Sequence, residues 1–259
     1  MADSAKWQKL IDIMSTLRSE NGCPWDKEQD HDSLKRYLLE ESYEVLDAID
    51  RRDDAALCDE LGDVLLQVVF HAQLAAEEGR FTIDDVVDAI NDKMIRRHPH
   101  IFSDANAGSA AEVLTMWEQI KKGEQKEKGE EKPSIMKVND NLPALMLAQK
   151  VQDKASGIGF DWPDIEGPKA KLAEELAELE AAETQEEKRD EFGDVLFALV
   201  NIGRFLDLNA EDALRHADKK FIRRFQYVEE AAAAAGKKLP DMTLAEMDSL
   251  WDKAKERGL

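Results

Sequence analysis

Pairs of acidic residues three positions apart are the feature of this sequence that could do chemistry. Glu41 and Glu44 form one pair, and Glu60 and Asp63 form another further along the chain. Residues three apart on a helix project from one face, with Cβ atoms about 5–6 Å apart. If the two helices pack antiparallel, the four carboxylates converge on one point.

The second half of the chain repeats this arrangement. The stretch 190-DEFGDVLFALVN-201 matches 59-DELGDVLLQVVF-70 at seven of twelve positions, at a constant offset of 131 residues. Shorter blocks match in the same order, among them 93-KMIRR-97 with 220-KFIRR-224. Matched blocks in one order indicate a duplicated helical domain. The second carboxylate set consists of Glu175, Glu178, Glu191 and Asp194.

Such carboxylate sets could hold a divalent cation. Four carboxylates in a partly buried site cannot all stay ionised without a counterion, because their pKa values would rise steeply. Carboxylate oxygens are the ligands that Mg²⁺ prefers. A single pair is common on an exposed helix and carries little meaning, but two pairs set in apolar helices, and repeated, favour a metal site. The sequence therefore predicts bound Mg²⁺, with Mn²⁺ as an alternative.

Composition narrows the class of protein. The chain has 259 residues, only 13 Gly and 7 Pro, and a formal net charge of −21. Long runs rich in Ala, Leu, Glu and Lys predict an all-helical fold. The acidic balance argues against nucleic acid as a partner, because phosphate backbones require clustered Lys and Arg. It does not exclude an anionic small substrate, since a bound cation can reverse the local field.

Cysteine usage and hydropathy indicate a cytoplasmic protein with no membrane partner. Cys23 and Cys58 lack the spacing of a zinc site, and a disulfide framework is not expected in a chain of this size. The N-terminal segment has no apolar signal core, and no run of about 18 apolar residues occurs.

The acidic residues lie on helices whose apolar pattern predicts burial. Apolar residues such as Leu65 and Leu196 recur around them at helical intervals. Gly62 and Gly193 lie in the middle of these helices, where glycine costs about 1 kcal/mol relative to alanine. We expect each glycine to let a neighbouring helix approach at the level of the acids, with a packing notch of no function as the alternative.

The expected fold is all-α, with two tandem helical-bundle domains. Residues 121–143 contain many charged residues, and this composition predicts a linker, although the first part could extend the helix that contains Trp117. We place the first repeat at residues 1–122, the charged linker at 123–140 and the second repeat at 141–259.

The motif set resembles a known enzyme family. An EExxE segment followed by ExxD on the next helix, together with NGCPWD, IRRHPHIF and GIGFDW, is similar to the all-α nucleoside triphosphate pyrophosphohydrolase superfamily. The resemblance implies Mg²⁺-dependent hydrolysis of nucleoside triphosphates between the α and β phosphates, giving the monophosphate and pyrophosphate. Ribo- and deoxynucleotides with a broad range of bases are the expected substrates, in a housekeeping role for the nucleotide pool.

The resemblance also assigns roles to residues. In the second repeat, the metal ligands would be Glu175, Glu178, Glu191 and Asp194, with Glu174 as an outer group or water-activating base. Lys220 and Arg224 would bind phosphate oxygens. Trp251 and the segment Phe160, Asp161 and Trp162 would form the base pocket. The corresponding residues of the first repeat are the possible metal ligands Glu41, Glu44, Glu60 and Asp63 and the possible substrate-binding residues Lys93, Arg97, Trp117 and Trp25.

Several alternatives stay open at this point. In this family the second repeat is the one credited with hydrolysis, yet the first repeat retains every acid. A specialised relative that cleaves dUTP or phosphoribosyl-ATP is one alternative, and a non-enzymatic helical scaffold is another. One repeat supplies few helices to enclose a nucleotide, so we also expect a homodimer whose helices complete bundles across subunits. Regulatory protein partners are not predictable from the sequence.

Overall fold

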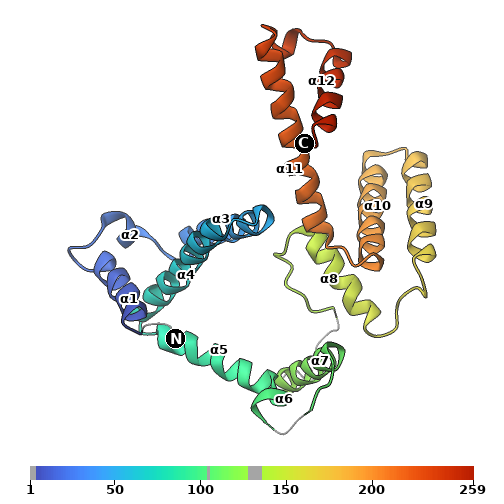
Figure 1. The fold of residues 1–259 in the computed structure, drawn as a ribbon. Helices are drawn as coiled ribbons and strands as arrows, with labels where there is room; N and C mark the ends of the chain where they lie inside the picture. Colours follow the sequence, from blue (N-terminus) through green and yellow to red (C-terminus); the bar gives the residue numbers. More distant parts are fainter. Residues whose placement is uncertain (1–3, 104–105, 128–135) are drawn as a thin grey trace. The chain divides into compact units, whose positions relative to one another are not determined.

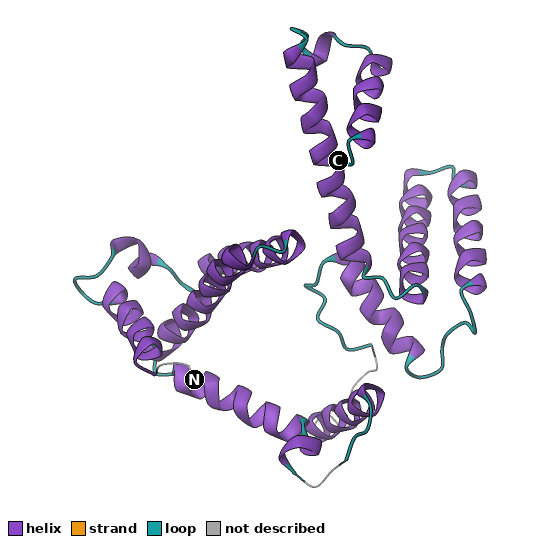
Figure 2. Cartoon of the chain, viewed as in Figure 1, coloured by secondary structure: helices purple, strands orange, loops and turns teal. Residues whose placement is uncertain are grey.

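The protein is built of helices. The computed structural model describes residues 4–103, 106–127 and 136–259, and these ranges contain no strand (Figure 1, Figure 2). The predicted all-α class is therefore confirmed. In the same ranges no helix combines the length and the hydropathy that a membrane span requires. The chain divides into two compact units, Met1–Gly129 and Glu130–Leu259.

The first unit contains seven helices in its described part. They are α1 (Ser4–Arg18), α2 (Pro24–Glu28), α3 (His31–Arg51), α4 (Asp54–Glu77), α5 (Ile83–Arg97), α6 (Pro99–Phe102) and α7 (Ala110–Glu127).

Helices α3 and α4 form an antiparallel hairpin at the centre of the first unit. Arg52 takes the left-handed conformation that ends α3, with φ 54°, and the Asp53 side chain then caps α4 by accepting a hydrogen bond from the Ala56 backbone N–H. Helix α1 packs against α4. The buried core of this unit consists of Met14, Leu34, Val69, Phe70 and Leu74.

The second unit contains five α-helices and one short 3₁₀ helix among its described residues. They are α8 (Ala144–Ser156), α9 (Glu166–Ala181), α10 (Gln185–Phe205), α11 (Ala210–Ala234), η1 (Leu239–Asp241) and α12 (Leu244–Glu256).

Helices α9 and α10 repeat the hairpin (Figure 1). A capping box starts α10: the Thr184 hydroxyl accepts from the Glu187 backbone N–H at 3.2 Å, and the Glu187 carboxylate accepts from the Thr184 N–H at 2.9 Å. Helix α8 packs against α10, and α11 packs against both α8 and α12. Gly236, at φ +67°, takes the left-handed conformation after α11 ends.

The predicted linker 123–140 spans the boundary between the units. Its first residues are helical, since α7 runs to Glu127, as the sequence allowed. Residues 128–135 lie outside the described residues, and those from Met136 onward lead into α8.

The burial of the repeated helices differs from the expectation in one respect. Val69 and Val200 are buried, but Leu61 and Leu65 of α4 and Leu196 of α10 are exposed, so a substantial part of each apolar surface is left uncovered within the chain.

The expected approach of a neighbouring helix at Gly62 and Gly193 is wrong within one chain. Apart from the adjacent residues and the backbone of its own helix, a Cβ atom built on Gly62 or Gly193 would meet no described atom within 4 Å.

Candidate active site

The α9–α10 hairpin brings the second carboxylate set together. One carboxylate oxygen each from Glu175, Glu191 and Asp194 lies within 4.8 Å of the others, and the same holds for Glu174, Glu175 and Glu178. Glu175 belongs to both groups and is buried, with 4% of its surface exposed. The i, i+3 spacing on two packed antiparallel helices therefore brings three of the four predicted ligands, Glu175, Glu191 and Asp194, to one point, whereas Glu178 groups with Glu174 and Glu175.

Lys171, a residue that sequence reasoning missed, is part of this cluster. Its ammonium nitrogen lies 2.8 Å from a Glu174 carboxylate oxygen and 2.6 Å from one of Glu175. Hydrogen bonds to these two carboxylates raise the pKa of Lys171 above its ordinary value. The available signal was the i, i+4 spacing of Lys171 and Glu175, but this spacing is common on exposed helices and does not by itself indicate a site.

The pKa of Glu178 reflects the close approach of the carboxylates. A hydrogen bond with Glu175, then burial, then the charges of Glu175 and Glu191 raise the pKa of Glu178. These effects disfavour the ionised form of Glu178, and a cation bound at the cluster would favour it.

A cavity of about 510 Å³ opens beside the cluster, entirely within the second unit. Glu175, Asp194 and Lys171 lie on its wall. Its other lining residues come from the segment before α8, from α8, from the loop before α9 and from α9 and α10: Met136, Val151, Gln152, Ala155, Phe160, Asp161, Trp162, Pro168, Phe197, Ala198, Asn201 and Arg204. A pocket of this size, mostly apolar with a few polar groups, is typical of a small-molecule site.

The predicted base-pocket segment lines this cavity. The rings of Phe160 and Trp162 are exposed and available for stacking. Asp161 forms a bidentate ion pair with Arg204, with N···O distances of 2.8 and 2.5 Å. The Arg204 guanidinium holds the pKa of Asp161 below its ordinary value. Asp161 thus anchors the aromatic loop to α10.

The predicted phosphate-binding residues lie on the α11–α12 hairpin. The Arg224 guanidinium donates to the Leu259 carbonyl at 2.6 Å and lies 5.7 Å from the centre of the Trp251 ring. Lys220 is exposed on α11. Neither Lys220 and Arg224 nor Trp251, which was predicted for the base pocket, lines the cavity of the second unit. Contact of these residues with a substrate would therefore require a partner subunit or a substrate that extends beyond the cavity.

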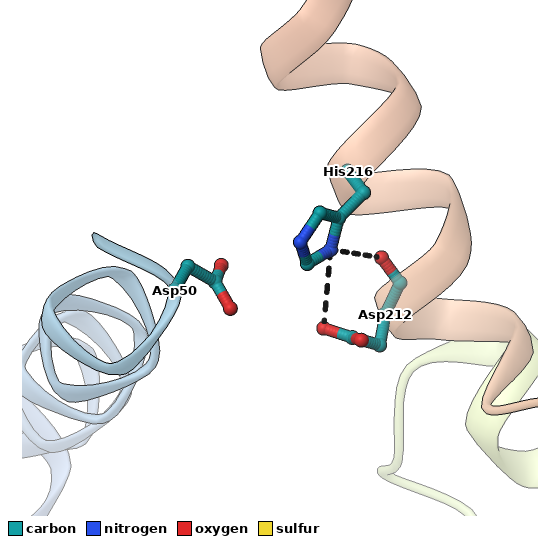
Figure 3. A group of neighbouring side chains, drawn as sticks. All are labelled: Asp50, Asp212 and His216. Carbon is teal, nitrogen blue, oxygen red and sulfur yellow. Dashed lines mark hydrogen bonds and ion pairs between the residues drawn. The ribbon is translucent and has the colours of Figure 1, made fainter. Parts of the chain in front are cut away.

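Helix α11 also carries His216, which is separate from the carboxylate cluster. Its Nδ1 lies 3.2 Å from the Asp212 carbonyl oxygen and 3.7 Å from the Asp212 carboxylate, one turn earlier (Figure 3). Asp212 lies in the first turn of α11, where an acid suits the helix dipole.

The first unit gathers its acids in the same way. One oxygen each from Glu41, Glu60 and Asp63 lies within 4.8 Å of the others, and Glu44 forms a hydrogen bond with Glu60. Burial, then the charge of Asp63, raises the pKa of Glu41. Burial, followed by the charge of Glu44, raises the pKa of Glu60.

The remaining predicted residues of the first unit make other contacts. Arg97 forms an ion pair with Glu124 of α7 at 2.7 Å. The Trp117 ring meets the His98 ring edge to face at 5.0 Å, and Trp25 meets Tyr37 similarly at 5.8 Å. Lys93 is half-buried on α5.

The residues around the first cluster differ from those around the second. By the repeat offsets, Tyr37 corresponds to Lys171 and Phe70 to Asn201. Phe70 belongs to the buried core of the first unit, and Tyr37 packs against that core. In the first unit, residues in or against the apolar core therefore hold the positions that polar cavity residues hold in the second unit.

Both clusters have a donor set that fits a hard divalent cation. Each offers at least three carboxylate oxygens in close proximity, which is the ligand type that Mg²⁺ prefers. The pKa values of Glu41, Glu60 and Glu178 are raised, and a bound cation would favour the ionised form of each group.

Comparison with known proteins identifies the family of the chain. A family model, the MazG nucleotide pyrophosphohydrolase domain, matches residues 29–102. The chain is 48% identical over 250 residues to the nucleoside triphosphate pyrophosphohydrolase/pyrophosphatase MazG of Thermotoga maritima, covering 96% of this chain and 95% of that protein. It is 46% identical over 257 residues to the nucleoside triphosphate pyrophosphohydrolase of Escherichia coli K12, covering 97% of each. The chain therefore belongs to the MazG family of nucleoside triphosphate pyrophosphohydrolases.

Proposed function

We propose that the second unit hydrolyses ribo- and deoxynucleoside triphosphates at the α–β bond, in the presence of Mg²⁺, to the monophosphate and pyrophosphate. The observation that carries this proposal is the cavity of about 510 Å³ whose wall holds Glu175, Asp194 and Lys171. It offers space for a base and sugar next to groups that suit a metal and a polyphosphate. The names of the Thermotoga maritima and Escherichia coli relatives, which specify nucleoside triphosphate pyrophosphohydrolases, support the same reaction class.

Residues of the second unit would have separate roles in the proposed reaction. Glu175, Glu178, Glu191 and Asp194 would hold Mg²⁺, which when bound neutralises phosphate charge and makes a water more acidic. Lys171 lies close enough to the cluster to exchange its carboxylate partners for a phosphate oxygen. Glu174, exposed at the edge of the cluster, is our candidate to accept the proton of the attacking water.

We assign the hydrolysis to the second unit because the residues near its carboxylate cluster differ from those near the cluster of the first unit. Both units gather carboxylates, but Phe70 and Tyr37 of the first unit belong to or pack against its apolar core. Their counterparts Asn201 and Lys171 line the cavity of the second unit. We propose that the first unit binds a cation without turning over nucleotides.

Broad base use is part of the proposal, and a dUTP- or phosphoribosyl-ATP-specific enzyme is the alternative. The cavity wall is mostly apolar and aromatic, and aromatic stacking tolerates every base. The scaffold alternative is set aside, because the chain belongs to an enzyme family.

We further propose a homodimer in the cytoplasm. The exposed apolar residues of α4 and α10 are the kind of surface that a second subunit would cover. Cys23 and Cys58 are free thiols, which suits the reducing compartment that contains the nucleotide pool.

Pyrophosphate release from a mixed nucleotide pool tests the reaction. We expect Mg²⁺-dependent formation of monophosphate and pyrophosphate, with neither diphosphate nor orthophosphate as the first product. Glu175→Gln and Asp194→Asn should each lower kcat/KM at least about 100-fold, because metal-assisted stabilisation of the transition state amounts to several kcal/mol.

The matched controls are Glu41→Gln and Asp63→Asn, at the equivalent positions of the first unit. These variants should keep turnover within about threefold of the unchanged protein. If they abolish turnover while Glu175→Gln and Asp194→Asn spare it, the reaction belongs to the first unit.

A further inference from the structure

Gln152 of α8 has an unusual environment. It is buried, with 6% of its surface exposed, and it lines the cavity of the second unit. Its side-chain Nε2 donates a hydrogen bond to the Phe197 carbonyl at 2.8 Å. This bond fixes the orientation of the amide, because a reversed amide would place two acceptors face to face.

The other end of the same amide is unpaired. Gln152 Oε1 is buried and has no hydrogen-bond partner among the described residues. A buried acceptor without a partner costs about 1–3 kcal/mol. Such a cost at the wall of a binding cavity indicates that a ligand supplies the missing donor.

Gln149, one turn earlier on α8, shows the ordinary arrangement. Its Nε2 donates to the Leu208 carbonyl at 3.3 Å, and its Oε1 accepts from the Ala210 backbone N–H at 3.2 Å. Both ends of that amide are bonded to the chain where it leads into α11, and Gln149 does not line the cavity. The unpaired oxygen of Gln152 is therefore not a general property of glutamine on this helix.

Asn201 adds a second polar group to the cavity wall. It is buried to the same degree as Gln152. Its Oδ1 accepts from Arg204 Nε at 3.1 Å and Nη2 at 2.9 Å. These bonds fix the amide of Asn201 as well, so that the cavity presents an acceptor on Gln152 and keeps a donor on Asn201.

We infer that Gln152 Oε1 is the acceptor that anchors the nucleobase, through an N–H group on its pairing edge. This inference rests on the proposed function of the second unit. Adenine and cytosine offer an amino group on that edge, and guanine, uracil and thymine offer a ring N–H. An acceptor that requires only this shared donor admits every standard base, and it rejects a base from which the donor has been removed.

Matched substrate pairs test the inference without any substitution. Purine riboside triphosphate is ATP without its amino group, and pyrimidin-2-one riboside triphosphate is CTP without its amino group. We expect the protein to hydrolyse each analogue with a kcat/KM about 10- to 100-fold below that of its parent, because the analogue leaves the buried oxygen unpaired.

Two variants assign the effect to a residue. Gln152→Met keeps the length of the side chain and removes the acceptor, so it should lower kcat/KM for ATP and reduce the ratio between ATP and its analogue to below about threefold. Gln149→Met is the matched control on the same helix and should keep the full ratio. Circular dichroism verifies that both variants are folded, and the comparison of substrates by the unchanged protein stands if either one is not.

The possible outcomes separate the two proposals. If the protein does not hydrolyse ATP, the proposed function fails. If it hydrolyses ATP and purine riboside triphosphate equally well, the proposed function stands and the role of Gln152 is overturned. Full discrimination retained by a folded Gln152→Met would overturn it as well.

Discussion

Lys171 is the residue that most clearly distinguishes the two carboxylate clusters. In the second unit its ammonium group contacts Glu174 and Glu175. In the first unit the equivalent residue is Tyr37, which packs against the core. The first cluster therefore has no ammonium at this position, and burial with mutual repulsion raises the pKa values of both Glu41 and Glu60.

Gly167 is a second residue whose identity matters for the cavity. A Cβ atom at this position would lie 2.2 Å from Cδ1 and 2.4 Å from Cγ of Trp162. Real Cβ atoms do not approach a ring so closely, so the Trp162 ring lies where it does because position 167 has no side chain.

The variant Gly167→Ala should therefore displace the Trp162 ring from the cavity wall. We expect kcat/KM to fall about 10-fold, since stacking of a base on an aromatic ring contributes about 1–3 kcal/mol. Steady-state kinetics measures the fall, and a change in tryptophan emission reports the movement of the ring.

Gly123→Ala is the control for this prediction. A Cβ atom on Gly123 of α7 would meet no described atom within 4 Å, so turnover should not change. Unchanged kinetics in Gly167→Ala would show that Trp162 does not contribute to substrate binding.

At the scale of elements, capping explains why α10, the second helix of the α9–α10 hairpin, begins where it does. Thr184 and Glu187 satisfy each other's backbone N–H groups at the start of α10, an arrangement readable from the sequence TQEE. This start sets the register of α10 and so places Glu191 and Asp194 opposite Glu175.

A different contact joins α5 to α7 in the first unit. Glu124 accepts from Arg97 at 2.7 Å and from Arg96 at 2.8 Å, and these bonds, that of Arg97 first, lower the pKa of Glu124 to about 2. Arg97 was predicted as a substrate-binding residue, and in this structure it holds two helices together.

The variant Glu124→Gln should lower the free energy of unfolding at pH 7 by about 1 kcal/mol, because Arg96 is half-exposed and solvent screens part of the interaction. The folded-state pKa of Glu124 lies below its ordinary value of 4.5. The stabilisation is therefore complete above pH 4.5 and is lost as the pH falls towards 2. Urea unfolding at pH 7, 4 and 3 should show a difference between the two proteins that shrinks at each step.

Asp92→Asn, at an exposed position on α5, is the matched control and should show no such trend. A constant difference between the unchanged protein and Glu124→Gln at all three pH values would contradict the assigned ion pair.

At the scale of the whole molecule, an apolar stripe on α10 is left uncovered. Phe192, Leu196 and Leu199 are all exposed, and they recur at intervals of three and four residues along one face. Leu61, Leu65 and Val68 hold the equivalent positions on α4 and are exposed too. Such a repeated apolar surface is the basis of the proposed homodimer.

The double variant Leu196→Lys/Leu199→Lys should convert the dimer to a monomer, because two charges would be buried in the interface without partners. Light scattering at micromolar concentration should give twice the chain mass of 29.3 kDa for the unchanged protein and a single chain mass for the variant.

Leu114→Lys, at an exposed position on α7, is the control and should stay dimeric. A single chain mass for the unchanged protein would refute the dimer and would leave the apolar stripes without explanation.

The amino-acid sequence alone determined much of this protein. Helical periodicity and the duplicated blocks were sufficient for the all-α class and for the tandem organisation. The i, i+3 spacing of Glu175 with Glu178 and of Glu191 with Asp194 was sufficient to predict converging carboxylates, because α-helical geometry fixes which residues share a face.

Only the tertiary structure decided how the two repeats differ. Whether a residue such as Asn201 or Phe70 lines a cavity or fills a core depends on which helices pack around it, and the sequence repeat gives both the same position. The pairing of Asp161 with Arg204 and the unpaired oxygen of Gln152 likewise join residues far apart in the chain. Local spacing cannot reveal such contacts, because they arise only when separate helices meet.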